Sequence, residues 1–199
     1  MSDRNSKKPN LILIGGGGHC TSVIDVVEQQ KIYKIAGILD PNLPFSEVLG
    51  YPILGSDDMI EELVDEHTYF LITVGQIKNN GIRKHIANKL EKYNANLATV
   101  ISPLAYVSSH ASINKGTIIM HYAFVNAKAR IGQHCIINTK ANIEHDARVH
   151  DFCHISTGAI VNGHSIIEEG TFVGSNATIS NGIIVKKNSI ISAGDFIKK

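Results

Sequence analysis

No apolar run in the sequence approaches the roughly 18 residues that a membrane-spanning helix needs, so we expect no membrane span. Neither sign of charge is in excess: 19 Lys and Arg stand against 18 Asp and Glu, and the basic residues form no stripe. This balance argues against a nucleic-acid partner. The segment Met1–Asn10 is polar, carries lysines and lacks an apolar centre, unlike a signal peptide. We expect residues 1–9 to be a disordered leader.

Cysteine is also scarce. Three cysteines in a chain without an export signal indicate a reducing compartment, so we expect a cytoplasmic protein. A length of 199 residues allows one large domain or two small ones.

From about Ala105 onward, a branched aliphatic residue returns at every sixth position. Neither a helix with 3.6 residues per turn nor a strand with a repeat of two keeps a period of six on one face over roughly ninety residues. A hexad that forms one short strand and one corner does so, and this is the signature of a hexapeptide β-helix. The positions are Val107, Ile113, Ile119, Val125, Ile131, Ile137, Ile143, Val149, Ile155, Val161, Ile167, Val173, Ile179, Val185, Ile191 and Ile197.

A second column, two residues before the first, is small or hydroxylated in almost every hexad. Three hexads would close one triangular coil of 18 residues, with the branched residue inside the prism and the small residue at the tight corner. At ~4.8 Å per stacked strand, about five coils give a prism roughly 25 Å tall. Cys135 and Cys153 are 18 apart in this column, so we expect them to stack in the core of neighbouring coils rather than to act in redox chemistry.

A different pattern occupies the N-terminal half. An apolar strand at Asn10–Ile14 leads into four consecutive glycines, an amphipathic helix at Cys20–Gln30 and a second strand at Lys34–Leu39. This order begins a nucleotide-binding βαβ unit, with the acid Asp40 at the tip of its second strand. The expected further elements are an edge strand at Tyr51–Leu54, a helix at Asp57–Glu66 capped by Ser56, a strand at Tyr69–Val74, a helix at Ile82–Tyr93 and a last strand at Leu97–Ile101.

Ser102 and Pro103 mark the border between the two patterns. The predicted fold class is therefore α/β plus all-β: a small Rossmann-like domain at residues 10–102, then a parallel β-helix domain at residues 103–199.

The glycine turn departs from the dinucleotide fingerprint, because its third glycine would fall at Cys20. A unit of about ninety residues has room for a mononucleotide, and the exposed N–H groups of a glycine turn that opens a helix suit a diphosphate. A tight turn that binds nothing is the alternative. Asp40 would either accept hydrogen bonds from a ribose or base edge, or cap the turn before Pro41.

The prism is rich in histidine, and the 18-residue circuit decides which side chains could meet. Gly163 follows His145 by one circuit, so its backbone N–H should lie beside the imidazole, an oxyanion donor next to a base. Asp146 offers a carboxylate to fix the tautomer of the ring. His154 is half a circuit away and faces another side, so it reaches His145 only across an interface with another copy of the chain.

Several motifs together resemble the bacterial sugar acetyltransferases, which include bacillosamine-type N-acetyltransferases and sialic-acid O-acetyltransferases. They are the run Asn138–Asp146 (NTKANIEHD), the run His154–Ala159 (HISTGA), the opening LIGGGGH, the ILD after the second strand, and Val74-Gly75 followed by Asn80 and Arg83. The similarity spans almost the whole chain. It implies a homotrimer of left-handed β-helices, each with a Rossmann-like domain that holds a sugar nucleotide, and acetyl-CoA in the cleft between neighbouring prisms.

The resemblance also implies roles for individual residues. His145 would be the general base, with Asp146 as its orienting carboxylate where the bacillosamine enzymes usually have Glu. Asn138 would support the amino group or the ring, and Gly163 would supply the oxyanion N–H. The acetyl-CoA cleft would contain His154, Ser175 and Ala193, and the nucleotide site would contain Gly17, Gly18, His19, Asp40 and Gly75. No metal is expected. Relatives usually continue with a proline-containing tail beyond the position of Lys199, and its absence would weaken the grip on CoA.

The predicted reaction is direct transfer of acetyl from acetyl-CoA to the amino group of a nucleotide-linked 4-amino-6-deoxy-sugar. O-acetylation of sialic acid or a related nonulosonic acid is the alternative. A zinc hydratase is a remote one: His145 and His150 have the required spacing of five, but His110 precedes His145 by 35, which is not a multiple of 18. The last alternative is a non-catalytic nucleotide-binding protein.

Overall fold

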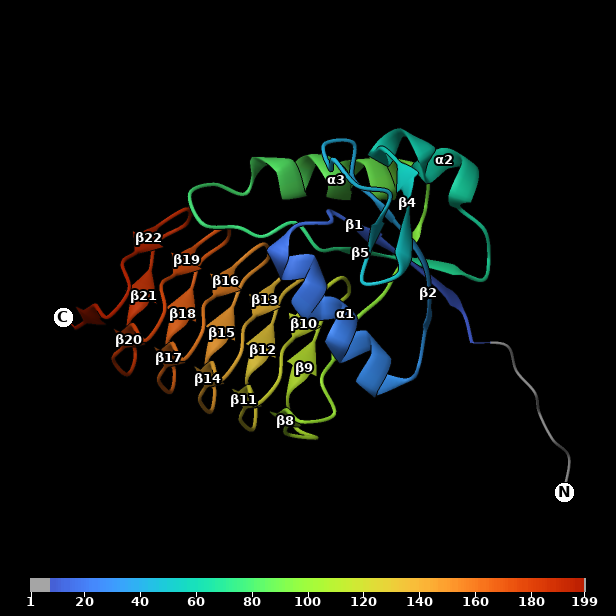
Figure 1. Cartoon of the computed structure of the whole chain (residues 1–199). Coiled ribbons are helices and arrows are strands. Elements are labelled where there is room, and N and C mark those ends of the chain that lie inside the picture. Colours follow the sequence, from blue (N-terminus) through green and yellow to red (C-terminus); the bar gives the residue numbers. More distant parts are fainter. Residues whose placement is uncertain (1–7, 199) are drawn as a thin grey trace, which may run out of the picture.

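The computed structural model describes residues 8–198, so residues 1–7 of the predicted leader lie outside the described residues. The N-terminal half is an α/β unit that sits against one end of a prism of stacked coils, which the C-terminal half forms (Figure 1). Both predicted classes of structure are present, in the predicted order.

The N-terminal sheet has the order β3-β4-β2-β1-β5-β6, and all its pairs are parallel except β3–β4. The α-helix α1 has its buried residues at Cys20, Val23, Ile24, Val26 and Val27, the spacing of one helical face. The bounds are β1 Asn10–Ile14, α1 Gly18–Gln30, β2 Lys34–Leu39, β3 Glu47–Val48, β4 Tyr51–Gly55, η1 Asp57–Met59, α2 Ile60–Leu63, β5 Thr68–Ile72, α3 Gly81–Lys92 and β6 Asn96–Leu97.

Two element predictions in this half are corrected. The helix expected at Asp57–Glu66 is one 3₁₀ turn followed by four α-helical residues, and Ser56 Oγ accepts a hydrogen bond from Asp58 N at 3.2 Å as its cap. Because Ile60 is the only fully buried side chain of α2, little apolar burial is available to prolong the helix. The strand at Tyr51–Gly55 is not at the edge, since β3 pairs outside it.

The last predicted strand, Leu97–Ile101, is split between the two halves. Leu97 belongs to β6 of the α/β sheet, whereas β7 (Val100–Ile101) pairs with β10 of the prism. Val100 packs into the core beneath α1 and Ile101 packs against the core of the prism. Val100 and Ile101 therefore point in opposite directions, each into a different hydrophobic core. The strand pairing of the prism begins at Val100, before the predicted domain border at residue 103.

The C-terminal half is a left-handed parallel β-helix of three sheets. Each strand pairs with the strand 18 residues away, as in Phe124 with Asn142 and Val125 with Ile143, so three hexads close one coil as predicted. The branched column is fully buried in the middle coils and partly buried at both ends. The strands are β8 Tyr106–Val107, β9 Ser112–Ile113, β10 Ile118–Ile119, β11 Phe124–Val125, β12 Arg130–Ile131, β13 Ile136–Ile137, β14 Asn142–Ile143, β15 Arg148–Val149, β16 His154–Ile155, β17 Ile160–Val161, β18 Ile166–Ile167, β19 Phe172–Val173, β20 Thr178–Ile179, β21 Ile184–Val185, β22 Ile190–Ile191 and β23 Phe196–Ile197.

Every sixth residue from Gly116 to Gly194 has a positive φ, so each corner of the prism contains one left-handed residue. Five of these are glycine, and the other nine, among them Lys128, Asp146 and His164, adopt φ values near 60°. Such a conformation is normally unfavourable for a residue with a Cβ, and here the hydrogen bonds between coils hold it. The left-handed turn places the side chains of Asp146 and His164 on an outer vertex of the prism.

Buried polar side chains fix the α/β unit on the prism. The Arg83 guanidinium, 1% exposed, donates to Val74 O at 2.6 Å within its own unit and to His134 O at 2.7 Å in the prism. Gln76 Nε2 donates to Phe152 O at 2.8 Å. Because these bonds satisfy carbonyls at the corners of several coils, the glycine turn and the prism keep one relative position.

Candidate functional site

The vertex that follows β14 carries the predicted base and its carboxylate. His145 Nδ1 lies 3.0 Å from Asp146 Oδ2, and this hydrogen bond holds the pKa of the Asp146 carboxyl below its usual range. An imidazole that donates from Nδ1 to a carboxylate keeps its lone pair on Nε2. The arrangement therefore orients the imidazole at the prism surface with Nε2 turned away from the carboxylate.

Gly163 lies directly beside the His145 ring on the next coil. A Cβ built on Gly163 would be 2.7 Å from His145 Cε1 and 2.8 Å from Nε2, so a side chain would displace the ring. Gly163 O accepts from Gly182 N at 3.0 Å, whereas the Gly163 N–H donates no hydrogen bond within residues 8–198. The predicted pairing of an imidazole with a bare amide is present in the structure.

Of the two carboxylates that flank His145 in sequence, only Asp146 is hydrogen-bonded to its ring. Glu144 instead accepts from Asn126 Nδ2 at 2.7 Å and from Asn142 Nδ2 at 3.2 Å. These bonds lower the pKa of Glu144 and hold it over the strand rather than over the imidazole.

His164 is a third member of this vertex, and the sequence analysis did not single it out. Its Nε2 is 3.9 Å from Asp146 Oδ2, and its ring meets the His145 ring edge-on with 5.3 Å between centroids. The sequence spacing could have predicted this contact, because residue 164 follows residue 146 by one circuit of 18 residues. The potential ligand atoms of His145, Asp146 and His164 lie within 4.8 Å of one another, so a cation could bind there. Among residues 8–198 of one chain, His110 and His150 belong to no such group.

A second group of predicted residues lies in a cleft of about 590 Å³ between the α/β unit and the prism. Its walls include His19, Gly75, Gln76, Asn138 and His154. His19, which follows the glycine turn, thus lines the same cleft as two prism residues that were assigned to different roles. Within one chain, Asn138 lies beside His154 and not beside His145.

The histidines of this cleft are neutral. Burial lowers the pKa of His19 to about 3 and that of His154 to about 4. His154 Nδ1 is 2.6 Å from the carbonyl oxygen of Gln76, so it must carry the proton, and Nε2 accepts from Asn138 Nδ2 at 3.2 Å. The side-chain nitrogen His19 Nε2 is buried and has no partner within the described residues, which leaves a polar atom available to a ligand.

The glycine turn divides into a structural part and an open part. Gly15 has φ +103° and a Cβ there would lie 2.5 Å from Val74, whereas a Cβ on Gly17 or Gly18 would meet nothing within 4 Å. The open glycines lead into α1, whose first turn has no side-chain cap. An anion site at this turn stays a prediction.

The Asp40 side chain caps the glycine turn and the turn after β2. One carboxylate oxygen accepts from Gly16 N at 2.8 Å and the other from Asn42 N at 2.9 Å. Of the two roles considered for Asp40, capping is the one in place, and a ribose contact would have to share oxygens that are already bonded.

The remaining predicted cofactor residues follow the cleft along the prism. Thr157 lines the cleft, and Ser175 and Ala193 follow it at intervals of one circuit on the next two coils. Ser175 Oγ is 3.0 Å from Ser156 Oγ. His154, Ser175 and Ala193 therefore lie on one side of the prism, one corner away from His145.

Comparisons with known proteins match both halves. The PglD N-terminal domain family matches residues 10–90, and the family described as hexapeptide repeat of succinyl-transferase matches residues 165–199. UDP-N-acetylbacillosamine N-acetyltransferase of Bacillus subtilis (strain 168) is 35% identical over 113 residues, which are 56% of this chain. The match spans about half (51%) of the length of that relative.

Solved structures match over nearly the whole chain. The acetyltransferase domain of PglB from Neisseria gonorrhoeae FA1090 has a TM-score of 0.90 and 29% identity, covering 96% of this chain and 91% of that one. The same domain in complex with acetyl coenzyme A has a TM-score of 0.88 and 29% identity over 95% and 90% of the two chains. A point mutant of perosamine N-acetyltransferase from Caulobacter crescentus, in complex with CoA and GDP-perosamine, has a TM-score of 0.89 and 28% identity over 96% and 89%.

Within residues 8–198, no helix has the length and apolarity that a membrane span requires. The resemblance inferred from the sequence is confirmed: the chain has the fold and the domain order of the bacterial hexapeptide-repeat sugar acetyltransferases.

Proposed function

We propose that the chain is a cytoplasmic acetyltransferase that moves an acetyl group from acetyl-CoA to the amino group of a nucleotide-linked amino sugar. The observation that carries this proposal is the pair of His145 and Asp146 stacked on the free N–H of Gly163. The relatives add support, since they include two N-acetyltransferases and complexes with acetyl coenzyme A, CoA and GDP-perosamine.

The proposed reaction is direct. The amine nitrogen of the sugar attacks the carbonyl carbon of the thioester, and His145 Nε2 takes a proton from the nitrogen. The Gly163 N–H stabilises the oxyanion, the C–S bond breaks, and the proton passes to the leaving thiolate of CoA. Base catalysis of this kind contributes about 10²–10⁴-fold, and holding two substrates in one cleft contributes further.

Cysteine chemistry offers no competing route. Burial raises the pKa of Cys135 to about 12, that of Cys20 to about 11, and that of Cys153 well above its usual range. All three thiols are buried. A thiol must ionise to act as a nucleophile, so a covalent acyl-cysteine intermediate is disfavoured.

The two groups of site residues lie on different corners of one prism, so a complete site needs a second copy of the chain. We propose a homotrimer in which His145, Asp146 and Gly163 of one subunit face the cleft of its neighbour. Acetyl-CoA would lie along His154, Ser175 and Ala193, with Asn138 supporting the acceptor. The open turn at Gly17 and Gly18, together with His19 and Gly75, would hold the nucleotide part.

A thiol-release assay tests the function. The wild-type protein is incubated with acetyl-CoA and, separately, with UDP-, GDP- and dTDP-linked 4-amino sugars and with free or CMP-linked sialic acid. We expect release of CoA with at least one amino sugar, an N-acetylated product by mass spectrometry, loss of activity in His145→Ala and normal activity in Cys153→Ser. Turnover with sialic acid alone would replace N-acetylation by O-acetylation. A healthy His145→Ala variant and a dead Cys153→Ser variant would refute the mechanism.

A further inference from the structure

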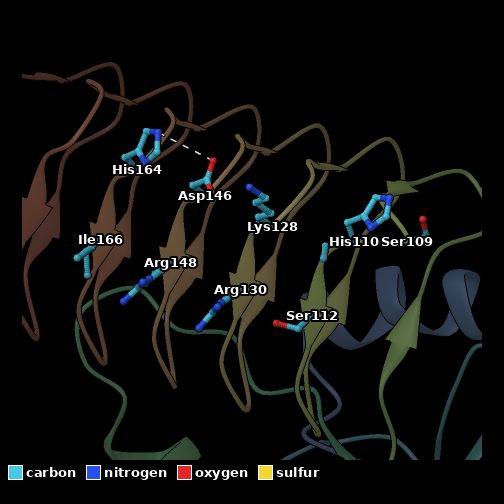
Figure 2. Close-up of a pocket in the computed structure, with 11 residues that line it drawn as sticks. Ser109, His110, Ser112, Lys128, Arg130, Asp146, Arg148, His164 and Ile166 are labelled. Carbon is cyan, nitrogen blue, oxygen red and sulfur yellow. Dashed lines mark ion pairs between the residues drawn. The ribbon is translucent and has the colours of Figure 1, made fainter.

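A basic groove runs along the vertex that carries the catalytic pair, toward the N-terminal coils (Figure 2). It has a volume of about 940 Å³, and its lining includes His110, Lys128, Arg130, Arg148 and His164. Figure 2 shows His110, Lys128, Asp146 and His164 along the corner, with the two arginines on the strands beside them. Asp146 is the only acidic residue of the lining.

Positive charges are stacked in this groove. Arg130 and Arg148 are directly opposite each other on the paired strands β12 and β15, and both are exposed. In the part of the chain that the structure describes, neither arginine nor Lys128 forms an ion pair with a carboxylate. Like charges directly opposite each other on paired strands destabilise a sheet. An anion that bridges them would remove this repulsion.

The excess of positive charge is confined to the groove. The chain as a whole has a net charge of +1, so the groove does not reflect a generally basic protein. Asp146, the single carboxylate, is bonded to His145 at 3.0 Å and lies on the rim of the groove. The groove therefore presents unpaired cations to a ligand whose reactive end can reach the base.

We propose that the basic groove, on the subunit that supplies His145, binds the diphosphate of the acceptor nucleotide sugar from the side opposite the glycine turn of the neighbouring subunit. This assignment rests on the proposed function and adds a specificity site to it. The two arginines are on adjacent strands, which are ~4.8 Å apart, so their guanidinium groups can bind the two linked phosphates of a nucleoside diphosphate. A ligand with a single carboxylate would use only one of them. Lys128, one coil from Asp146, adds a third donor between the phosphates and the base.

CoA also contains a diphosphate, but the position of the groove favours the sugar nucleotide as its ligand. The groove extends from His164 and Ile166, past Asp146, the partner of His145, toward the N-terminal coils, where residues 109–112 line its far end. The proposed CoA residues Ser175 and Ala193 lie on later coils and at another corner. The groove thus runs away from the proposed CoA residues, toward the N-terminal coils.

The double variant Arg130→Gln/Arg148→Gln tests the proposal by steady-state kinetics of the full-length enzyme. We expect the KM for the nucleotide amino sugar to rise about tenfold or more, with kcat and the KM for acetyl-CoA changed less than about threefold. The control Lys186→Gln/Lys187→Gln removes two positive charges from a distant coil and should leave all three parameters unchanged. An unchanged KM for the nucleotide sugar, or an increase confined to acetyl-CoA, would overturn the proposal.

Direct binding separates this proposal from the proposed function. Calorimetry with UDP, GDP and dTDP should show at least one nucleotide that binds the wild-type protein, and binding about tenfold weaker or worse in the double variant. If the wild-type protein transfers no acetyl group but shows this difference, the function is wrong and the groove assignment stands. If the double variant binds nucleotide normally but falls apart into monomers on gel filtration, the arginines pair with a neighbouring subunit and the assignment is wrong.

Discussion

His145 and Gly163 are 18 residues apart and in contact: a Cβ added to Gly163 would lie 2.7 Å from His145 Cε1. The contact follows from one closed coil, and it places a backbone N–H beside an imidazole that Asp146 orients. The His145 ring occupies the space where a side chain of residue 163 would be. Residue 163 must therefore be glycine for the ring to keep its position.

Replacing Gly163 by Ala should therefore impair catalysis through the ring of His145. The new methyl group would push the imidazole away from its position, and we expect kcat to fall about 10²-fold or more, since misplacement of a catalytic group by 1 Å has effects of that size. Steady-state kinetics checks this, with thermal unfolding to confirm the fold. Asn181→Ala, an exposed change one coil farther along the same column, is the matched control. A Gly163→Ala enzyme with wild-type kcat would contradict the geometry.

Asp146→Asn removes the charge and keeps the shape. Asn tolerates the left-handed backbone at this corner, where φ is 61°, so the fold should survive. The carboxylate holds the tautomer and orientation of the imidazole through Nδ1, and a neutral amide holds them less strongly. We therefore expect kcat to fall about 10- to 100-fold, measured by steady-state kinetics.

Glu144→Gln is the control for Asp146→Asn, because the Glu144 side chain is hydrogen-bonded to two asparagines and not to the His145 ring. Its kcat should match that of the wild-type protein. Equal losses in the two variants would show that Asp146 has no special relation to the base.

The buried histidines predict how stability depends on pH. Burial lowers the pKa of His19 to about 3 and of His134 and His154 to about 4, below the ordinary value of about 6.5. Between about pH 4 and 6.5 the unfolded chain binds protons that the folded chain does not, so stability falls as the pH falls through this range. Three such groups give an upper limit of about 4 kcal/mol per pH unit.

Thermal unfolding at fixed protein concentration from pH 7.5 to 5 measures this dependence. We expect the midpoint to drop as the pH falls, and to drop less in His134→Asn, which lacks one of the three groups and keeps a residue suited to φ 54°. His67→Asn changes an exposed histidine and should leave the slope as it is. A midpoint that is constant over this range would show that these side chains do not remain neutral in the folded protein.

Much of this architecture could be predicted because it is periodic. The hexad column specified the coil length, the coil length specified that Gly163 stacks on His145, and the two cysteines stack in neighbouring coils as expected. The same arithmetic would have found His164 beside Asp146 if it had been applied to the corner residues. The left-handed corners could not be read in this way, because nine of them are not glycine and only the closed coil imposes their conformation.

The contacts between the two halves had no periodic signal. Arg83 and Gln76 look like ordinary polar residues in the sequence, yet both are almost fully buried and bond to prism carbonyls. Their role depends on how one domain docks on the other, which local patterns do not specify. The grouping of Asn138 with His154 and His19 in one cleft depends on the same docking.

Complementation between two inactive variants tests most directly whether the site is shared between subunits. His145→Ala lacks the base, and His154→Ala lacks a residue of the cleft, so each homotrimer should be nearly inactive. When the two chains are co-expressed and assemble randomly, about a quarter of the seams combine an intact His145 with an intact His154. The account predicts recovery of acetyl transfer to about that fraction of the wild-type rate. A mixed preparation that contains both chains in one oligomer and is no more active than its parents would contradict it.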